Sequence, residues 1–169
     1  ILRRLGLYKR GPVSNIFIFE TNTNGTIGGE GSVVFLLSDK LSTDNLAELN
    51  GIQTFYRPNN NEEIEQKIIA FLSMHTLQIE DVDLVITGKN GDTKNDKVYH
   101  QLTQSLFSNT TLANYKHLCG EYSTSSAFAL WLASNIIKKE EVPAVVAKWN
   151  KENGKPKKIL RYNGYLNIY

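Results

Sequence analysis

The chain has 169 residues, of which 41% are hydrophobic and 21% charged, a composition typical of a globular domain and not of a disordered segment. Its single cysteine, Cys119, excludes an internal disulfide framework, and a net charge of +2 gives no reason to expect a nucleic-acid partner. The apolar runs are far shorter than the ~20 residues of a membrane-spanning helix, so we expect no membrane partner. A lone thiol and the lack of a leader pattern favour a cytoplasmic location.

Three segments in the first third of the chain have the composition of β-strands. Residues 15–19 and 32–38 are apolar runs on either side of a connection rich in Gly, Asn and Thr. A third strand is expected over residues 48–56, before the turn signal Arg57-Pro58.

A helix is predicted to follow, with Asn61 as the residue that caps its N-terminus. Glu62 and Glu63 in its first turn complement the helix dipole. One face should be buried, because apolar residues recur on it at helical spacing: Ile64, Ile68, Phe71 and Leu72.

The middle of the chain reads as a strand, a loop and a helix. Residues 83–87 form a short apolar strand, and residues 88–92 form a loop rich in residues that tolerate positive φ. The helix begins at about Asn95 and carries an apolar stripe: Val98, Leu102 and Leu106.

A further strand near residues 112–118, a loop at Gly120 and a helix over residues 124–138 come next. This helix is apolar on nearly all sides and rich in Ala and Ser, so we expect it in the protein interior. Residues 159–162 and 165–169 then flank Asn163-Gly164, a strong hairpin signal. The alternation of strands and helices predicts an α/β domain with a mixed sheet.

Three stretches together resemble the C-terminal portion of a β-ketoacyl (3-oxoacyl-acyl carrier protein) synthase of the thiolase-like superfamily. Residues 25–36 resemble the family's Gly-Glu-Gly-Ala turn and strand, residues 83–96 its first histidine loop, and residues 115–127 its lysine and Gly-His segment. The resemblance implies the C-terminal half of a thiolase-like layered fold, with a mixed sheet and a buried small-residue helix. It makes residues 1–169 one region whose nucleophile-bearing half would lie upstream of Ile1.

The chain departs from the family at the residues that perform the chemistry. A decarboxylating condensing enzyme uses an acyl-carrying cysteine and two histidines that donate N–H groups to developing negative charge. The alignment places Gly88 at the first histidine and Glu121 at the second, while Lys116 matches the family's lysine. Glycine has no side chain, and an ionised glutamate only accepts hydrogen bonds. We therefore expect a catalytically incomplete site in which Glu121 pairs with Lys116.

This pattern resembles chain-length factors, catalytically silent homologues that pair with an active ketosynthase in fatty acid, polyketide or aryl-polyene biosynthesis. The resemblance implies a heterodimer with that ketosynthase, or a homodimer, and an acyl carrier protein as a further partner, with Lys9 and Arg10 as possible contacts. It implies no cofactor and no metal. Two alternatives stay open: an active synthase, and an unrelated α/β binding module. The module would be favoured if the strands after Gly31 and before Gly88 were not neighbours in one sheet.

Simpler interpretations apply to the remaining candidates. The glycines near residue 28 match neither dinucleotide nor phosphate loop patterns, and the three histidines lack metal-ligand spacing. His117 and Cys119 are poorly spaced for a thiol and its base. For Asn90, Asp92 and Asp96, capping of the loop is a better explanation than a cation site.

Overall fold

A computed structural model describes residues 4–149 and 155–164 of the protein. Its centre is a four-stranded sheet in the order β3-β2-β1-β4. The strands are β1 (Leu84–Thr87), β2 (Thr111–Asn114), β3 (Ala147–Trp149) and β4 (Ile159–Tyr162). β1 pairs in parallel with both β2 and β4, whereas β3 joins β2 antiparallel. The mixed α/β architecture expected from the sequence is confirmed.

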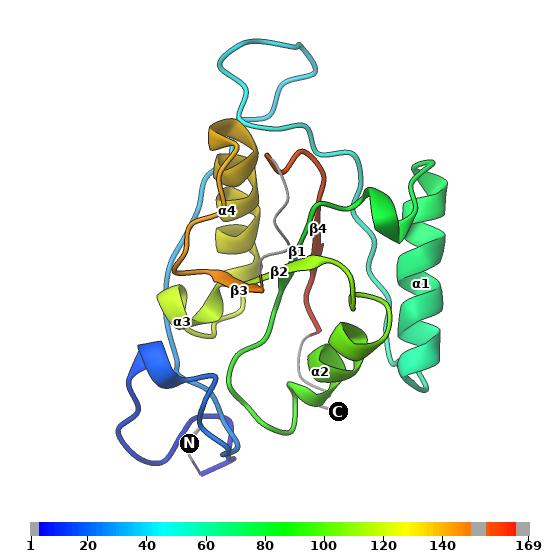
Figure 1. Ribbon diagram of the computed structural model, residues 1–169. Helices are drawn as coiled ribbons and strands as arrows, with labels where there is room; N and C mark the ends of the chain where they lie inside the picture. Colours follow the sequence, from blue (N-terminus) through cyan, green and yellow to red (C-terminus); the bar gives the residue numbers. More distant parts are fainter. Residues whose placement is uncertain (1–3, 150–154, 165–169) are drawn as a thin grey trace.

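Helices cover both faces of this sheet (Figure 1). On one face, α1 (Asn61–Met74) and α2 (Lys97–Gln104) share an apolar cluster with Val85 and Leu112. On the other, α4 (Ser125–Lys139) packs on Leu84 and Ile86, and the short α3 (Lys116–Cys119) lies beside it. The 3-10 turns η1 (Asn15–Phe17) and η2 (Ile79–Asp81) complete the elements. Within the described residues no helix is long and apolar enough to cross a membrane.

The predicted helices are present, with small differences at their ends. Asn60, not Asn61, caps α1, because its side-chain oxygen accepts the Glu63 N–H at 2.9 Å. Ile64, Ile68 and Leu72 form the buried face of α1, as their spacing predicts. α4 buries Ala129, Leu132, Ala133 and Ile136, whereas Trp131 on its outer face is 43% exposed. The interior position predicted for α4 therefore holds for one face of the helix.

The three strands predicted in the N-terminal third are wrong. Residues 15–19 begin with η1, and residues 32–38 and 48–56 form no strand. Val34 and Leu36 in the second segment are 94% and 99% exposed. Apolar and β-branched composition favours an extended chain, but a strand also needs a neighbour that accepts its backbone hydrogen bonds. No described strand pairs with these segments.

The strand predicted over residues 112–118 ends earlier than expected. β2 stops at Asn114, and the following residues turn into α3. Gly120 terminates this turn with a φ of 73°, and its N–H donates to the Lys116 carbonyl at 2.7 Å. The short edge strand β3 was not predicted. The second arm of the expected Asn163-Gly164 hairpin lies outside the described residues, and the first arm, β4, pairs in parallel with β1.

The buried face of α1 gives a direct test of the packing. Ile68 is 5% exposed and its neighbour Ile69 is 48% exposed. Truncating a buried isoleucine removes apolar contacts and leaves a cavity, so Ile68→Ala should lower the free energy of unfolding by about 3 kcal/mol. Ile69→Ala, the same change one position along, should cost less than about 1 kcal/mol. Chemical denaturation of both variants measures the difference, and equal losses would contradict this orientation of α1.

Candidate functional site

The three site residues predicted from the sequence, Gly88, Lys116 and Glu121, follow the ends of β1 and β2. Gly88 directly follows β1, and Lys116 lies two residues beyond the last residue of β2. Glu121 follows α3, the helical turn that begins at Lys116. In open α/β sheets, ligands bind outside the carboxyl ends of parallel strands. This end of the sheet is therefore the first place to seek a functional site.

Lys116 and Glu121 form a buried ion pair, as expected from the family resemblance. The Lys116 ammonium lies 2.5 Å from the Glu121 carboxylate, and the two side chains are 1% and 8% exposed. The Asn90 amide donates to the same carboxylate oxygen at 2.7 Å, and the Ser125 hydroxyl donates to the other at 3.2 Å. Burial lowers the pKa of Lys116, and the charge of Glu121 opposes that shift. The carboxylate is thus fully engaged as an acceptor.

The backbone around the pair is held by a close junction of glycines. The Gly29 N–H donates to the Glu121 carbonyl at 3.1 Å, and the Glu121 N–H donates to the Ile27 carbonyl at 2.8 Å. A Cβ on Gly29 would lie 1.9 Å from the Cys119 carbonyl oxygen, and one on Gly120 would lie 2.7 Å from the Gly29 Cα. The turn near residue 28 and the turn after α3 can approach this closely only because Gly29 and Gly120 have no side chains.

Gly88 faces a different set of neighbours. A Cβ at this position would lie 1.9 Å from the Asn163 side-chain oxygen and 2.7 Å from the Tyr99 hydroxyl. The Tyr99 hydroxyl donates to the Gly164 carbonyl at 3.0 Å and accepts the Gly164 N–H at 2.8 Å. The space next to Gly88 is therefore occupied by the segment that follows β4.

Arg161 and Tyr115 belong to the same polar end of the sheet, and the sequence analysis missed both. Arg161 on β4 is in register with Ile86, and its charge acts on Lys116 and Tyr115. The Arg161 Nε and the Tyr115 hydroxyl are buried, and neither forms a hydrogen bond within the part of the chain that the structure describes. Burial raises the pKa of Tyr115 to about 12. Strand alternation places Arg161 on the same face as Ile159, and this was the signal available in the sequence.

None of the three imidazoles reaches the ion pair. The His117 Nε2 lies 2.9 Å from the Val145 carbonyl oxygen, and its ring packs edge-on against Phe19. His117 lies on a helical turn, not on the extended segment expected, and its imidazole contacts Val145 and not Glu121. His75 lies at the end of α1, and His100 lines a separate hollow. Burial raises the pKa of Cys119 to about 11, so its thiol is not ionised near neutral pH.

Lys9 and Arg10 lie in different environments. The Lys9 side chain is buried, and its ammonium donates to the Thr23 carbonyl, the Thr23 hydroxyl and the Gly91 carbonyl at 2.9–3.2 Å. Arg10 is exposed. Only Arg10 of the two is therefore placed to contact a partner, because the Lys9 ammonium holds the N-terminal segment on the loop at residue 91.

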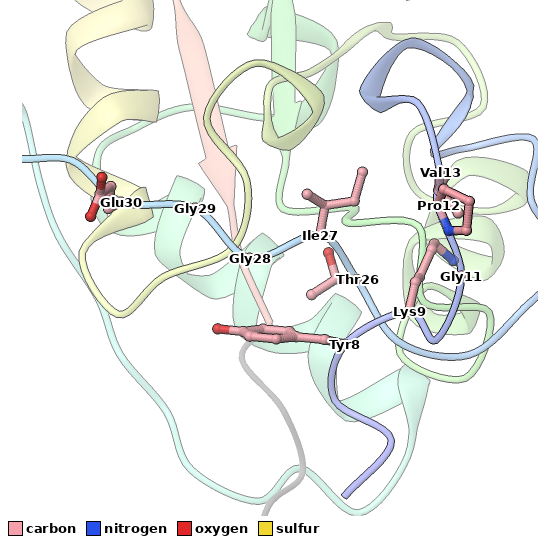
Figure 2. Close-up of a pocket in the computed structure, with 10 residues that line it drawn as sticks. All are labelled: Tyr8, Lys9, Gly11, Pro12, Val13, Thr26, Ile27, Gly28, Gly29 and Glu30. Atoms are coloured by element: carbon pink, nitrogen blue, oxygen red, sulfur yellow. The ribbon is translucent and has the colours of Figure 1, made fainter. Parts of the chain in front are cut away.

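A hollow of about 610 Å³ opens beside the glycine junction (Figure 2). It is lined by residues 26–30, which include Gly28 and Gly29, and by a second group from the start of the chain: Tyr8, Lys9, Gly11, Pro12 and Val13. The Tyr8 ring lies against Gly28, where a Cβ would be 2.9 Å from the ring. The volume is in the range of small-molecule pockets, about 300–1,000 Å³.

The loop at residues 88–96 is held by its own acidic residues, as expected. The Asp96 carboxylate accepts the N–H groups of Asn90 and Gly91 at 2.9 and 2.8 Å. Asp92 accepts the Lys94 N–H at 2.9 Å. No group of three potential metal ligands occurs among the described residues. Burial raises the pKa of Asp96 to about 6, despite the two backbone N–H groups that favour its ionised form.

Comparison of the chain with protein-family models, with curated proteins and with solved structures found no match.

The Lys116–Glu121 pair should behave as one unit in stability measurements. Glu121→Gln leaves a buried ammonium without a counter-charge and should lower the free energy of unfolding by about 3–5 kcal/mol. The double variant Lys116→Met, Glu121→Gln removes both charges at nearly constant volume and should recover most of that loss. Lys67→Met, at the half-exposed Lys67–Glu63 pair on α1, serves as the control and should have a much smaller effect. Additive losses in the double variant would contradict the coupling.

Asp96 should give the stability a distinct pH dependence. Its pKa of about 6 exceeds the unfolded value near 4, so between these values the folded state keeps a proton that the unfolded chain has lost. Stability therefore decreases as pH rises through this window, by about 3 kcal/mol in total. Asp96→Asn cannot titrate, so the difference in unfolding free energy between wild type and variant should change by that amount between pH 4 and 7. A constant difference would contradict the shifted pKa.

Proposed function

We propose that the protein is a noncatalytic ketosynthase-like subunit of the chain-length-factor type, with a thiolase-like fold. It pairs with an active ketosynthase in fatty acid, polyketide or aryl-polyene biosynthesis and shares that enzyme's acyl carrier protein. The observation that carries this proposal is the buried Lys116–Glu121 pair, in which Glu121 is the residue that the resemblance aligns with a catalytic histidine of condensing enzymes.

The chemistry explains why this pair matters. Decarboxylation of a malonyl thioester places negative charge on the thioester oxygen, and the rate depends on N–H donors aimed at that oxygen. The Glu121 carboxylate accepts hydrogen bonds from Lys116, Asn90 and Ser125 and has no proton to donate. Gly88 supplies no donor side chain either. A carboxylate so close to a developing oxyanion would raise the barrier, so the site lacks the means to catalyse this step.

An active synthase is the first alternative. It requires an imidazole next to Lys116, and His117, the nearest in sequence, has its Nε2 at the Val145 carbonyl. The orientation of His117 therefore argues against this alternative.

An unrelated α/β binding module is the second alternative, and one observation favours it. Residues 32–38 form no strand beside β1, whereas the synthase pattern expects the strand after Gly31 in the same sheet. The hollow at Tyr8 and Gly28 would then be the natural ligand site of such a module. The two proposals differ in the partner they require.

Purified chain, free of ketosynthase, should neither decarboxylate malonyl-acyl carrier protein nor condense it with an acyl group. Glu121→His should stay inactive, because Gly88 leaves the other donor missing. Co-expression with a ketosynthase from the same organism should give a one-to-one complex by native mass spectrometry. Condensation by the isolated wild-type chain would support the active synthase. A monomer at micromolar concentration that retains no ketosynthase would support the binding module.

A further inference from the structure

A second hollow, of about 200 Å³, lies between the segment after η1 and the start of α2. It is more than large enough for a phosphate group, since one water molecule occupies about 30 Å³ in the liquid. Phe19 forms part of one wall, and Lys89, Lys97 and His100 contribute basic groups from the loop and helix opposite. It is separate from the Lys116–Glu121 pair and from the hollow at Tyr8, whose linings share none of these residues.

Two ammonium groups converge on the Phe19 ring. The Lys89 Nζ lies 5.7 Å from the ring centroid and the Lys148 Nζ lies 4.9 Å from it. Both ammonium groups thus lie next to a ring that lines the hollow, and neither donates a hydrogen bond to another described residue. Burial is the largest cause of the lowered pKa of Lys89; the charge of Asp96 opposes the shift, and the smaller effect of Lys148 adds to it.

Asp96, one of the acidic residues of the hollow, raises the pKa of Lys89 through its charge but forms no direct ion pair with it. Among the described residues, Lys89, Lys97 and Lys148 form no ion pair with any carboxylate. Asp96 lines the hollow, but both of its oxygens accept backbone N–H groups. Glu20 lines it as well and is exposed. Lysine groups that converge without a counter-ion repel one another, and an anion among them removes that repulsion.

We propose that this hollow, lined by Phe19, Lys89, Lys97 and His100 with the Lys148 ammonium next to the Phe19 ring, is a binding site for a phosphate group. The ammonium groups supply charge-assisted donors to the phosphate oxygens, and the Phe19 ring supplies an apolar wall for an organic substituent on the phosphate. The site does not depend on the proposed ketosynthase pairing, because every group that forms it belongs to this chain.

The test is calorimetric titration of the full chain at low salt with inorganic diphosphate, inorganic phosphate and glycerol 3-phosphate. Diphosphate should bind, and a loss of one charge-assisted donor in Lys89→Met should weaken it about tenfold. Tighter binding of glycerol 3-phosphate than of inorganic phosphate would identify a phosphorylated metabolite as the ligand, and the reverse order would identify the free anion.

Lys67→Met is the matched control. The Lys67 ammonium also lies over an aromatic ring, 5.6 Å from the centroid of Phe55, but it belongs to α1, which contributes no residue to the hollow. This variant should bind diphosphate like the wild type, and thermal unfolding of both variants checks that each is folded. Absence of diphosphate binding at millimolar concentration, or equal weakening in the Lys67 and Lys89 variants, would overturn the proposal.

Discussion

The Lys116 ammonium is the group on which the organisation of this end of the molecule depends. Moving an ammonium from water into a protein interior costs several kcal/mol unless a counter-charge and hydrogen bonds compensate for it. Glu121 supplies the charge, and Asn90 and Ser125 satisfy the carboxylate. These partners come from the loop after β1, the turn after α3 and the start of α4, so a single buried charge fixes three separate elements in relation to one another.

The two apolar clusters and the polar site have different roles. Each cluster lies between one face of the sheet and the helices that cover it, and this packing stabilises the layers. The N-terminal segment is attached by polar contacts: Lys9 to the Gly91 carbonyl, and the Thr26 hydroxyl to the Asn90 carbonyl at 2.6 Å. Hydrogen bonds weaken when their angle departs from linear. These contacts therefore fix the position of the loop at residues 88–96 more closely than apolar packing would.

Local patterns in the sequence predicted the elements that are specified by their own residues. Examples are the helices α1 and α4, from the spacing of their apolar residues, and the strand β1, from its short apolar run. Residues 32–38 show the limit, because composition does not say which strand will accept the backbone hydrogen bonds. The Lys116–Glu121 pair was predicted through a family resemblance that aligned both residues with one site. Arg161 was missed because the residues on which its charge acts, Tyr115 and Lys116, are distant in sequence and follow another strand of the sheet.

The contacts of the N-terminal segment have a consequence for the order of folding. The bond from Lys9 to Gly91 spans 82 positions, and the glycine junction joins regions still further apart. Contacts of this length form late, because the chain entropy lost in closing the loop precedes the gain. Residues 4–29 therefore reach these contacts only after α3 and the turn at Gly120 have formed. Until then the apolar residues of this segment lack their native partners, and a chain in that state is prone to misassembly.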